Sequence, residues 1–164
     1  NPVAPGEPGE ICVRGPAVME EYWRRPELTA EAFAHGWLHT GDVARSDERG
    51  YLTVVDRIKD LIISGGFNVY PREVEDALAT HDAVAVAAVF GMPDPKWGEA
   101  VAAAVVLRPG AEATGEELSA FVRERKGAVQ APKSVHVLEA LPTTAVGKID
   151  KKALRSALSS AGSA

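Results

Sequence analysis

The sequence predicts an α+β fold in which a β-rich segment precedes a small unit of mixed strands and helices. Two runs rich in alanine and valine, residues 83–91 and 99–107, are typical of strands buried on both faces. Helix-start signals stand at Pro71, which suits a first helical turn, and at Thr114, which opens a Thr-x-x-Glu capping box. A charged link at residues 56–60 separates two short apolar strands and marks a solvated joint, which is a candidate pivot.

The first part of the chain carries strand and turn signals but no obvious core of its own. We therefore expect it to complete a larger domain that is missing here. The first nine residues show neither an initiator methionine nor the regions of a signal peptide, so we expect a fragment cut from a longer chain. The expected elements are a strand at 10–16, a helix at 26–33, a turn with aromatic flanks at 35–42, a hairpin turn at 47–50 and a strand at 51–55.

The second part, beyond a boundary near Lys59, has the pattern of a compact α+β unit whose helices place apolar residues on one face. The segment between its two buried strands, residues 91–98, is too irregular for a tight hairpin. The expected elements are a helix at 71–80, strands at 83–91 and 99–107, a helix from 114, a strand at 134–138, a helix at 149–158 and a disordered tail at 159–164.

Composition narrows the function classes. With 164 residues, 46% hydrophobic and 25% charged, the chain has the make-up of one or two small soluble domains. A net charge of −5 argues against a nucleic-acid or anionic-membrane surface. The single Cys12 excludes an internal disulfide and fits a reducing compartment, so we expect a cytoplasmic protein. The longest apolar stretches fall well short of the roughly 20 residues that cross a bilayer, so no membrane span is expected.

Two loops of the second part carry residues suited to ligands. Gly65 and Gly66 directly follow a strand, and glycine lets a ligand approach the main chain closely; the plainer interpretation is a hairpin turn. Lys148 follows a glycine on the polar loop 141–151, where it is a flexible point charge for a phosphate or a carboxylate. Taken alone this signal is weak, because most lysines are solvated surface groups.

Four ordered motifs resemble the C-terminal portion of the adenylate-forming superfamily, which includes acyl-CoA synthetases, luciferases and adenylation domains of peptide synthetases. The resemblance covers nearly the whole chain, and the Ser64–Pro71 loop looks like the acyl-CoA synthetase version. It implies a small mobile C-terminal lid domain at residues 59–164, preceded at 1–58 by the incomplete end of the large N-terminal domain. The motifs are Glu10 to Pro16, Thr40-Gly41-Asp42, Asp56 to Glu75, and Pro142 to Lys148.

The resemblance assigns three polar residues to ATP chemistry. Asp42 matches the ribose-binding acid, and a carboxylate can accept both hydroxyl hydrogens of a vicinal diol. Arg57 matches the second ribose contact. Lys148 matches the lysine that bridges the carboxylic acid and the ATP phosphates during adenylation, where an ammonium stabilises the charge of the transition state. The alternatives are a simple turn at Asp42 and a surface arginine in a charged link at Arg57.

The resemblance assigns the remaining site residues to the second half-reaction. Lys59 falls at the domain hinge, about which the small domain rotates after adenylation. Ser64, Gly65 and Gly66 match the wall of the channel that admits coenzyme A. The alternative for Lys59 is a residue that only solvates a linker.

Other polar and aromatic residues are given structural interpretations. Trp97, in a Trp-Gly-Glu motif, is predicted to be a packing anchor rather than a ligand contact. The four histidines have no metal-ligand spacing among them, so no metal site is expected. Glu73, Glu75 and Asp76 are predicted to be helix-start charges. The basic residues Lys151, Lys152 and Arg155 are predicted to form a solvated helix face.

These resemblances imply the C-terminal part of an ATP-dependent acyl- or aryl-CoA ligase that converts a carboxylic acid into an acyl-adenylate and then a thioester, as in fatty acid metabolism. The implied partners are the small carboxylic acid, ATP with Mg²⁺, coenzyme A as co-substrate, and the missing N-terminal domain in cis. The acyl pocket and the Mg²⁺ site belong upstream, so the acid is unspecified and the fragment alone is expected to be inactive. Two alternatives stay open: an adenylation domain that loads a carrier-protein thiol, and a non-enzymatic interaction module with this fold.

Overall fold

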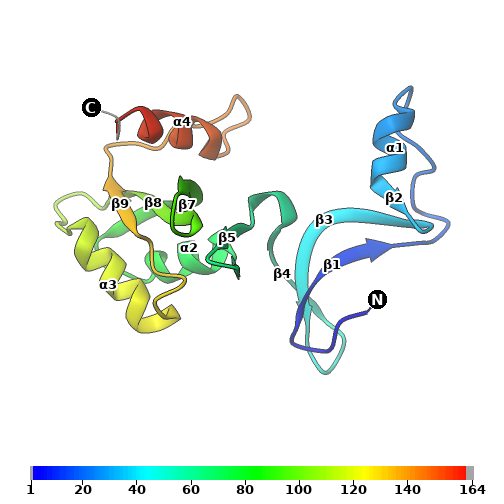
Figure 1. Cartoon of the computed structure of the whole chain (residues 1–164), viewed down its shortest axis with the longest axis horizontal. Coiled ribbons are helices and arrows are strands. Elements are labelled where there is room, and N and C mark those ends of the chain that lie inside the picture. Colours follow the sequence, from blue (N-terminus) through cyan, green and yellow to red (C-terminus); the bar gives the residue numbers. More distant parts are fainter. Residues whose placement is uncertain (1, 162–164) are drawn as a thin grey trace. The chain divides into compact units, whose positions relative to one another are not determined.

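The computed structural model describes residues 2–161. The chain divides into two compact units, Asn1–Lys59 and Asp60–Ala164 (Figure 1). Among residues 2–161 no helix is long and apolar enough to cross a membrane. The α+β class predicted from the sequence is confirmed, because the helices accompany two sheets whose strand pairs are antiparallel except for β8 with β9.

Unit 1 is an antiparallel sheet built around the long strand β3, which pairs with β1, β2 and β4 (Figure 1). Among the described residues of this unit only Val43 and Ala44 are buried, so the expectation that it has no core of its own is confirmed. The elements are β1 (Pro8–Val13), α1 (Pro26–Ala32), β2 (Phe33–Ala34), β3 (Trp37–Ser46) and β4 (Leu52–Arg57). The 3₁₀ helix η1 (Ile58–Asp60) spans the boundary between the two units.

The turn predicted at 35–42 is wrong beyond its first two residues. His35 and Gly36, with φ values of 53° and 75°, form a two-residue turn between β2 and β3. From Trp37 onward the chain is a strand that includes Thr40-Gly41-Asp42. Strands on either side supply hydrogen-bond partners to this segment, and these non-local pairings override its local turn preference.

Unit 2 contains a sheet in the order β6–β5–β8–β7, with β9 added parallel to β8 and the other pairs antiparallel. The strand β8 alternates between two hydrophobic layers. Its residues Val101, Ala103 and Val105 pack with α2 and α3, whereas Ala102 and Ala104 pack with α4 on the opposite face (Figure 1). The elements are β5 (Ile62–Ser64), β6 (Phe67–Val69), α2 (Pro71–Ala79), β7 (Val84–Asp94), β8 (Gly98–Leu107), α3 (Gly115–Lys126), β9 (Ser134–Val137) and α4 (Lys151–Ala161).

The prediction that residues 91–98 are too irregular for a tight hairpin is wrong. Pairing of β7 with β8 continues to Asp94 and Gly98, which leaves a three-residue loop. The Asp94 carboxylate accepts the backbone N–H groups of Lys96 and Trp97 at 2.8 and 2.9 Å and so closes the loop. The Asp94 side chain therefore stabilises a tight loop that the sequence pattern did not predict.

The helix starts of unit 2 follow their local signals. Pro71 occupies the first turn of α2, and the Thr114–Glu117 capping box at α3 is present in both directions. Helix α4 begins at Lys151, two residues later than predicted, because Asp150 Oδ1 accepts the N–H of Ala153 and caps the helix. The tail predicted from residue 159 is wrong up to residue 161, which is helical; the rest of that prediction lies outside the described residues.

Candidate functional site

The structure brings together two residues predicted to bind the nucleotide. Asp42 on β3 and Arg57 on β4 are cross-strand partners, and Arg57 Nε donates to Asp42 Oδ1 at 2.8 Å. Their side chains are 35% and 53% exposed, so the ion pair itself adds at most about 1 kcal/mol to stability. The bond uses one N–H of Arg57 and one oxygen of Asp42, and both groups have further hydrogen-bonding capacity for a diol.

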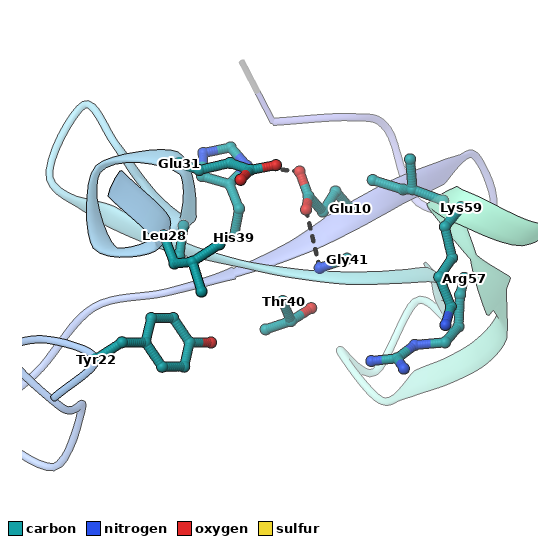
Figure 2. A pocket seen from close by; sticks show the side chains of 11 residues that line it. Glu10, Tyr22, Leu28, Glu31, His39, Thr40, Gly41, Arg57 and Lys59 are labelled. Carbon is teal, nitrogen blue, oxygen red and sulfur yellow. Dashed lines mark hydrogen bonds and ion pairs between the residues drawn. The ribbon is translucent and has the colours of Figure 1, made fainter. Parts of the chain in front are cut away.

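Hydrogen bonds from β1 fix the backbone that carries Asp42. Glu10 Oε1 accepts the N–H of Gly41 at 3.0 Å (Figure 2). Thr40 Oγ1 donates to the carbonyl of Ile11 at 2.9 Å. Thr40 Oγ1 also accepts the N–H of Asp42 at 3.1 Å. Gly41 has a φ of 73°, which favours glycine. The carboxylate of Asp42 is therefore held on a constrained strand rather than on a loose turn.

A hollow of about 610 Å³ opens beside this segment within unit 1 (Figure 2). Thr40 and Gly41 lie against it, Tyr22 and Leu28 provide apolar lining, and Arg57 enters from the other side. Apolar walls with a few polar groups are typical of small-molecule sites. The full lining is Glu10, Tyr22, Leu28, Glu31, Ala32, His39, Thr40, Gly41, Arg57, Ile58 and Lys59.

A cluster of Glu10, Cys12 and His39 lies next to the hollow, with ligand atoms within 4.8 Å of one another. His39 Nδ1 is 2.6 Å from Glu10 Oε2 and 3.6 Å from Cys12 Sγ. Burial, and secondarily the Glu10 carboxylate, raise the pKa of the Cys12 thiol, which disfavours the thiolate that metals bind. Histidine spacing could not reveal this cluster, because strand pairing sets Cys12 opposite His39. Through Glu10, the cluster instead holds β1 to β3, the strand that carries Asp42; we call Glu10 and His39 the Glu10 clamp.

Lys59, the predicted hinge residue, lies in η1 with an exposed side chain. It is the last residue of unit 1, and Asp60 is the first of unit 2. None of the three residues of η1 is buried. The hinge role itself stays a prediction.

Gly65 and Gly66 form the two-residue turn between β5 and β6, with φ values of 58° and 82°. Gly65 N–H donates to the carbonyl of Trp97 at 2.8 Å, and a Cβ at residue 65 would lie 2.7 Å from Trp97 Cε3. Ser64 is buried. A shallow hollow of about 190 Å³ borders this turn, lined by Ser64, Phe67, Trp97, Ala128, Val129 and Lys133.

The Trp-Gly-Glu motif has the structural role predicted for it. Trp97 packs over Gly65, although its side chain is 37% exposed. Two ammonium groups, of Lys96 and Lys133, lie 4.8 and 5.7 Å from the Trp97 ring. Glu99 Oε2 accepts the N–H of Ile63 at 3.0 Å and so holds β5 to the hairpin.

Lys148 is exposed on a loop that its own backbone closes. Residues Thr143 and Ile149 form a β-bridge, and Lys148 O accepts the N–H of Thr144 at 2.7 Å. Gly147, with a φ of 78°, donates its N–H to the carbonyl of Thr144 at 2.9 Å. Lys148 is therefore an exposed residue on a loop that is closed by backbone hydrogen bonds.

The prediction of a solvated helix face is wrong for Lys151, whereas Arg155 is exposed as predicted although it also has a backbone partner. Glu75, predicted to be a helix-start charge, lies beyond the first turn of α2. Lys151 Nζ is 2.8 Å from Glu75 Oε1, and Arg155 Nε donates to the carbonyl of Gly91 at 2.8 Å. The sequence shows polar residues on helices, and their partners 76 and 64 residues away in the chain become neighbours only through the fold. Lys152 is exposed, as predicted.

A family model and curated relatives all show that the chain is similar to the C-terminal part of AMP-binding enzymes. Residues 73–148 match the family model of the AMP-binding enzyme C-terminal domain. The chain is 56% identical over 162 residues to a medium/long-chain-fatty-acid–CoA ligase of Mycobacterium tuberculosis, covering 94% of this chain and 28% of that protein. It is 53% identical over 155 residues to a feruloyl-CoA synthase of Amycolatopsis sp, covering 94% of this chain and 32% of that protein. The chain thus spans about a third or less of these curated relatives.

Solved structures resemble the chain over a similar share. An amide bond synthetase from Marinactinospora thermotolerans superposes with a TM-score of 0.87 at 46% identity, covering 95% of this chain and 32% of that one. The o-succinylbenzoate CoA synthetase from Bacillus subtilis, in complex with its acyl-adenylate intermediate, gives 0.84 at 42% identity, covering 93% and 31%.

Proposed function

We propose that this chain, which belongs to the adenylate-forming superfamily, acts as the C-terminal part of an ATP-dependent acyl- or aryl-CoA ligase. In the first half-reaction a carboxylate oxygen of the acid attacks the α-phosphorus of ATP, and pyrophosphate leaves. In the second, the thiol sulfur of coenzyme A attacks the acyl carbonyl carbon, loses its proton, and AMP leaves. The proposed co-substrates are ATP, accompanied by Mg²⁺, and coenzyme A, and the proposed compartment is the cytoplasm.

In this proposal Asp42 and Arg57 bind the ribose of the nucleotide. Arg57 lines the hollow in unit 1 and keeps further N–H donors, whereas Asp42 does not line it and is joined to it through its bond with Arg57 and its neighbour Gly41. The Glu10 clamp keeps Asp42 in place without the nucleotide, so ordering costs little on binding. Apolar Tyr22 and Leu28 lie in the same hollow, where flat or aliphatic ligand surface would pack.

Lys148 is the proposed catalytic residue of adenylation, and its exposed ammonium on an ordered loop is the observation that carries the proposal. Negative charge accumulates around the α-phosphorus as the acid attacks. An ammonium held by a preorganised loop stabilises that charge without reorganising during the reaction. The loop itself is closed by hydrogen bonds, which supports a mechanism in which the ammonium is brought to and from the phosphates by movement of the unit that carries it.

The proposed role of Ser64, Gly65 and Gly66 is to line the path of coenzyme A in the second half-reaction. A side chain at residue 65 would meet Trp97, so glycine leaves the backbone of this turn uncovered. Lys148 and this turn belong to the same unit, so a rotation at Lys59 would move both together. Such domain alternation would present Lys148 in the first half-reaction and the Gly65–Gly66 turn in the second, at the same site.

The test uses the complete ligase that contains this chain, with a Lys148→Ala variant and the exposed Lys152→Ala as matched control. We expect Lys148→Ala to slow acid-dependent pyrophosphate release by about 10²–10³-fold, as loss of one transition-state donor does. Thioester formation from a supplied acyl-adenylate should stay within roughly threefold, because that step breaks the bond to the acyl carbon and involves no attack at phosphorus. Equal loss of both half-reactions would contradict the proposal.

One alternative acceptor follows from a specific similarity. The resemblance to an amide bond synthetase favours an amine as the second candidate for the group that attacks the acyl-adenylate. Supplying coenzyme A, a carrier-protein thiol or an amine to the preformed acyl-adenylate separates these acceptors directly. Screening short, long and aromatic acids by pyrophosphate release identifies the acid.

A further inference from the structure

The edge of the sheet in unit 2 contains an ion pair whose role the proposed function leaves unexplained. Glu75 on α2 accepts two bonds through the same oxygen: the backbone N–H of Val89 on β7 and the ammonium of Lys151 on α4, both at 2.8 Å. The side chains of Glu75 and Lys151 are 24% and 28% exposed. One carboxylate therefore joins the edge strand, α2 and the first residue of α4.

Two further contacts seat the beginning of α4 on the same strand. Arg155 Nε donates to the carbonyl of Gly91 at 2.8 Å, so the edge of β7 is covered by side chains from both neighbouring helices. Leu154 is 2% exposed and packs in the cluster that contains Ala88 and Phe90. The first turn of α4 is thereby placed by one apolar and two polar contacts.

The Lys148 loop runs directly into this turn. Asp150 donates its N–H to the carbonyl of Pro142 at 2.8 Å and accepts the N–H groups of Ala153 and Leu154. Lys148 is three residues before Lys151. Because the loop is closed on itself, its orientation follows that of the first turn of α4.

We propose that the Glu75–Lys151 ion pair positions the Lys148 ammonium for adenylation. This inference rests on the proposed function of Lys148. The two side chains are only 28% and 24% exposed, so removing one of them also leaves a mostly buried charge without its partner. The proposed effect on rate lies in geometry, because Lys151 is tied to β7 through Glu75 and fixes the exit of the loop. Displacing a reacting group by about 1 Å can cost up to about 100-fold in rate, so a small tilt of α4 is enough to matter. Glu75 and Lys151 are positioning residues and touch no substrate.

The experiment uses the complete ligase with Lys151→Met, Glu75→Gln, the double variant and Lys152→Met as matched control. Glu75→Gln keeps an oxygen that can accept the N–H of Val89, so the edge of β7 stays covered. We expect each single variant to lower kcat for pyrophosphate release about 10-fold, with the double variant within about twofold of either single one, because both remove the same interaction. Thioester formation from supplied acyl-adenylate should change less than about twofold, and Lys152→Met should change neither.

A second measurement separates positioning from general damage. Amide hydrogen exchange at residues 142–150 should quicken in Lys151→Met, whereas exchange in β7 and β8 should stay as in the parent. Unchanged pyrophosphate release, equal loss of both half-reactions, or unchanged exchange in the loop would each overturn the inference. If Lys148→Ala itself spares adenylation, the proposed function fails; if it abolishes adenylation while Lys151→Met is neutral, only the positioning role fails.

Discussion

Substituting alanine for the two adjacent glycines of the β5–β6 turn should have unequal effects on the stability of unit 2. Both Gly65 and Gly66 have φ values in the left-handed region. A Cβ at Gly66 would meet no heavy atom within 4 Å, whereas a Cβ at Gly65 would lie 2.7 Å from Trp97 Cε3 and 3.1 Å from Cζ3. The two variants therefore share a backbone cost, and only one adds a steric cost.

The magnitudes follow from those two terms. The left-handed conformation costs a non-glycine residue about 1–2 kcal/mol, which applies to both variants. Overpacking adds about 1–3 kcal/mol, and the partial exposure of Trp97 lets the ring yield, so we take the lower end. We expect about 1–2 kcal/mol of destabilisation for Gly66→Ala and about 2–3 kcal/mol for Gly65→Ala.

The assay is urea unfolding followed by circular dichroism, with Trp97→Ala and the double variant Gly65→Ala/Trp97→Ala included. In the Trp97→Ala background the extra cost of Gly65→Ala should disappear, because the side chain it would meet is gone. Equal destabilisation by the two single variants, or an extra cost that survives the removal of the indole, would refute the steric argument.

Two further predictions concern titrating groups. Backbone and side-chain hydrogen bonds from Thr114 lower the pKa of Glu117 below its ordinary 4.5. The ionised Glu117 therefore stabilises the fold above that pH, and this stabilisation is lost as the pH falls through the lower folded pKa. In Glu117→Gln the midpoint of urea unfolding should depend less on pH between pH 6 and about 3. Burial, and secondarily the charge of Glu10, raise the pKa of the Cys12 thiol, so iodoacetamide at about pH 8 should alkylate Cys12 more slowly than free cysteine. Glu10→Gln should quicken this reaction. Equal rates in the parent and the variant would contradict the effect of Glu10 on the pKa.

Elements with local signals were predictable from the sequence. The Thr114 capping box, the proline at the start of α2 and the alanine- and valine-rich strands all form where the pattern indicates. The failures share a physical cause. Strand β3 contains residues that favour turns, yet pairing with β1 and β4 keeps it extended, and no local pattern reports pairing across the chain.

In the candidate site, too, single residues could be predicted from the sequence but their contacts could not. Asp42 and Arg57 could be singled out from motifs, but their cross-strand bond follows from the register of β3 and β4. Glu10 and His39 could not be recognised as a clamp, because their contact depends on a register shift between Glu10 and Cys12. Hydrophobic periodicity identified the apolar face of α4, but it carries no information about which polar residues find partners.

Hydrogen bonds hold both parts of unit 2 that are proposed to meet ligands, and this limits how the proposed reaction can proceed. Hydrogen bonds close the Lys148 loop, and its neighbour α4 is tied to β7, so the loop cannot travel far by itself. The Gly65 turn is bonded to Trp97 and is equally constrained. In the proposed mechanism, motion between the half-reactions is therefore expected outside these two parts. Residues 58–60 form a 3₁₀ turn without a buried side chain, so changing their backbone angles removes no core packing. The proposed rotation at Lys59 would therefore disturb no buried side chain of η1, and the hinge prediction should be tested at this residue.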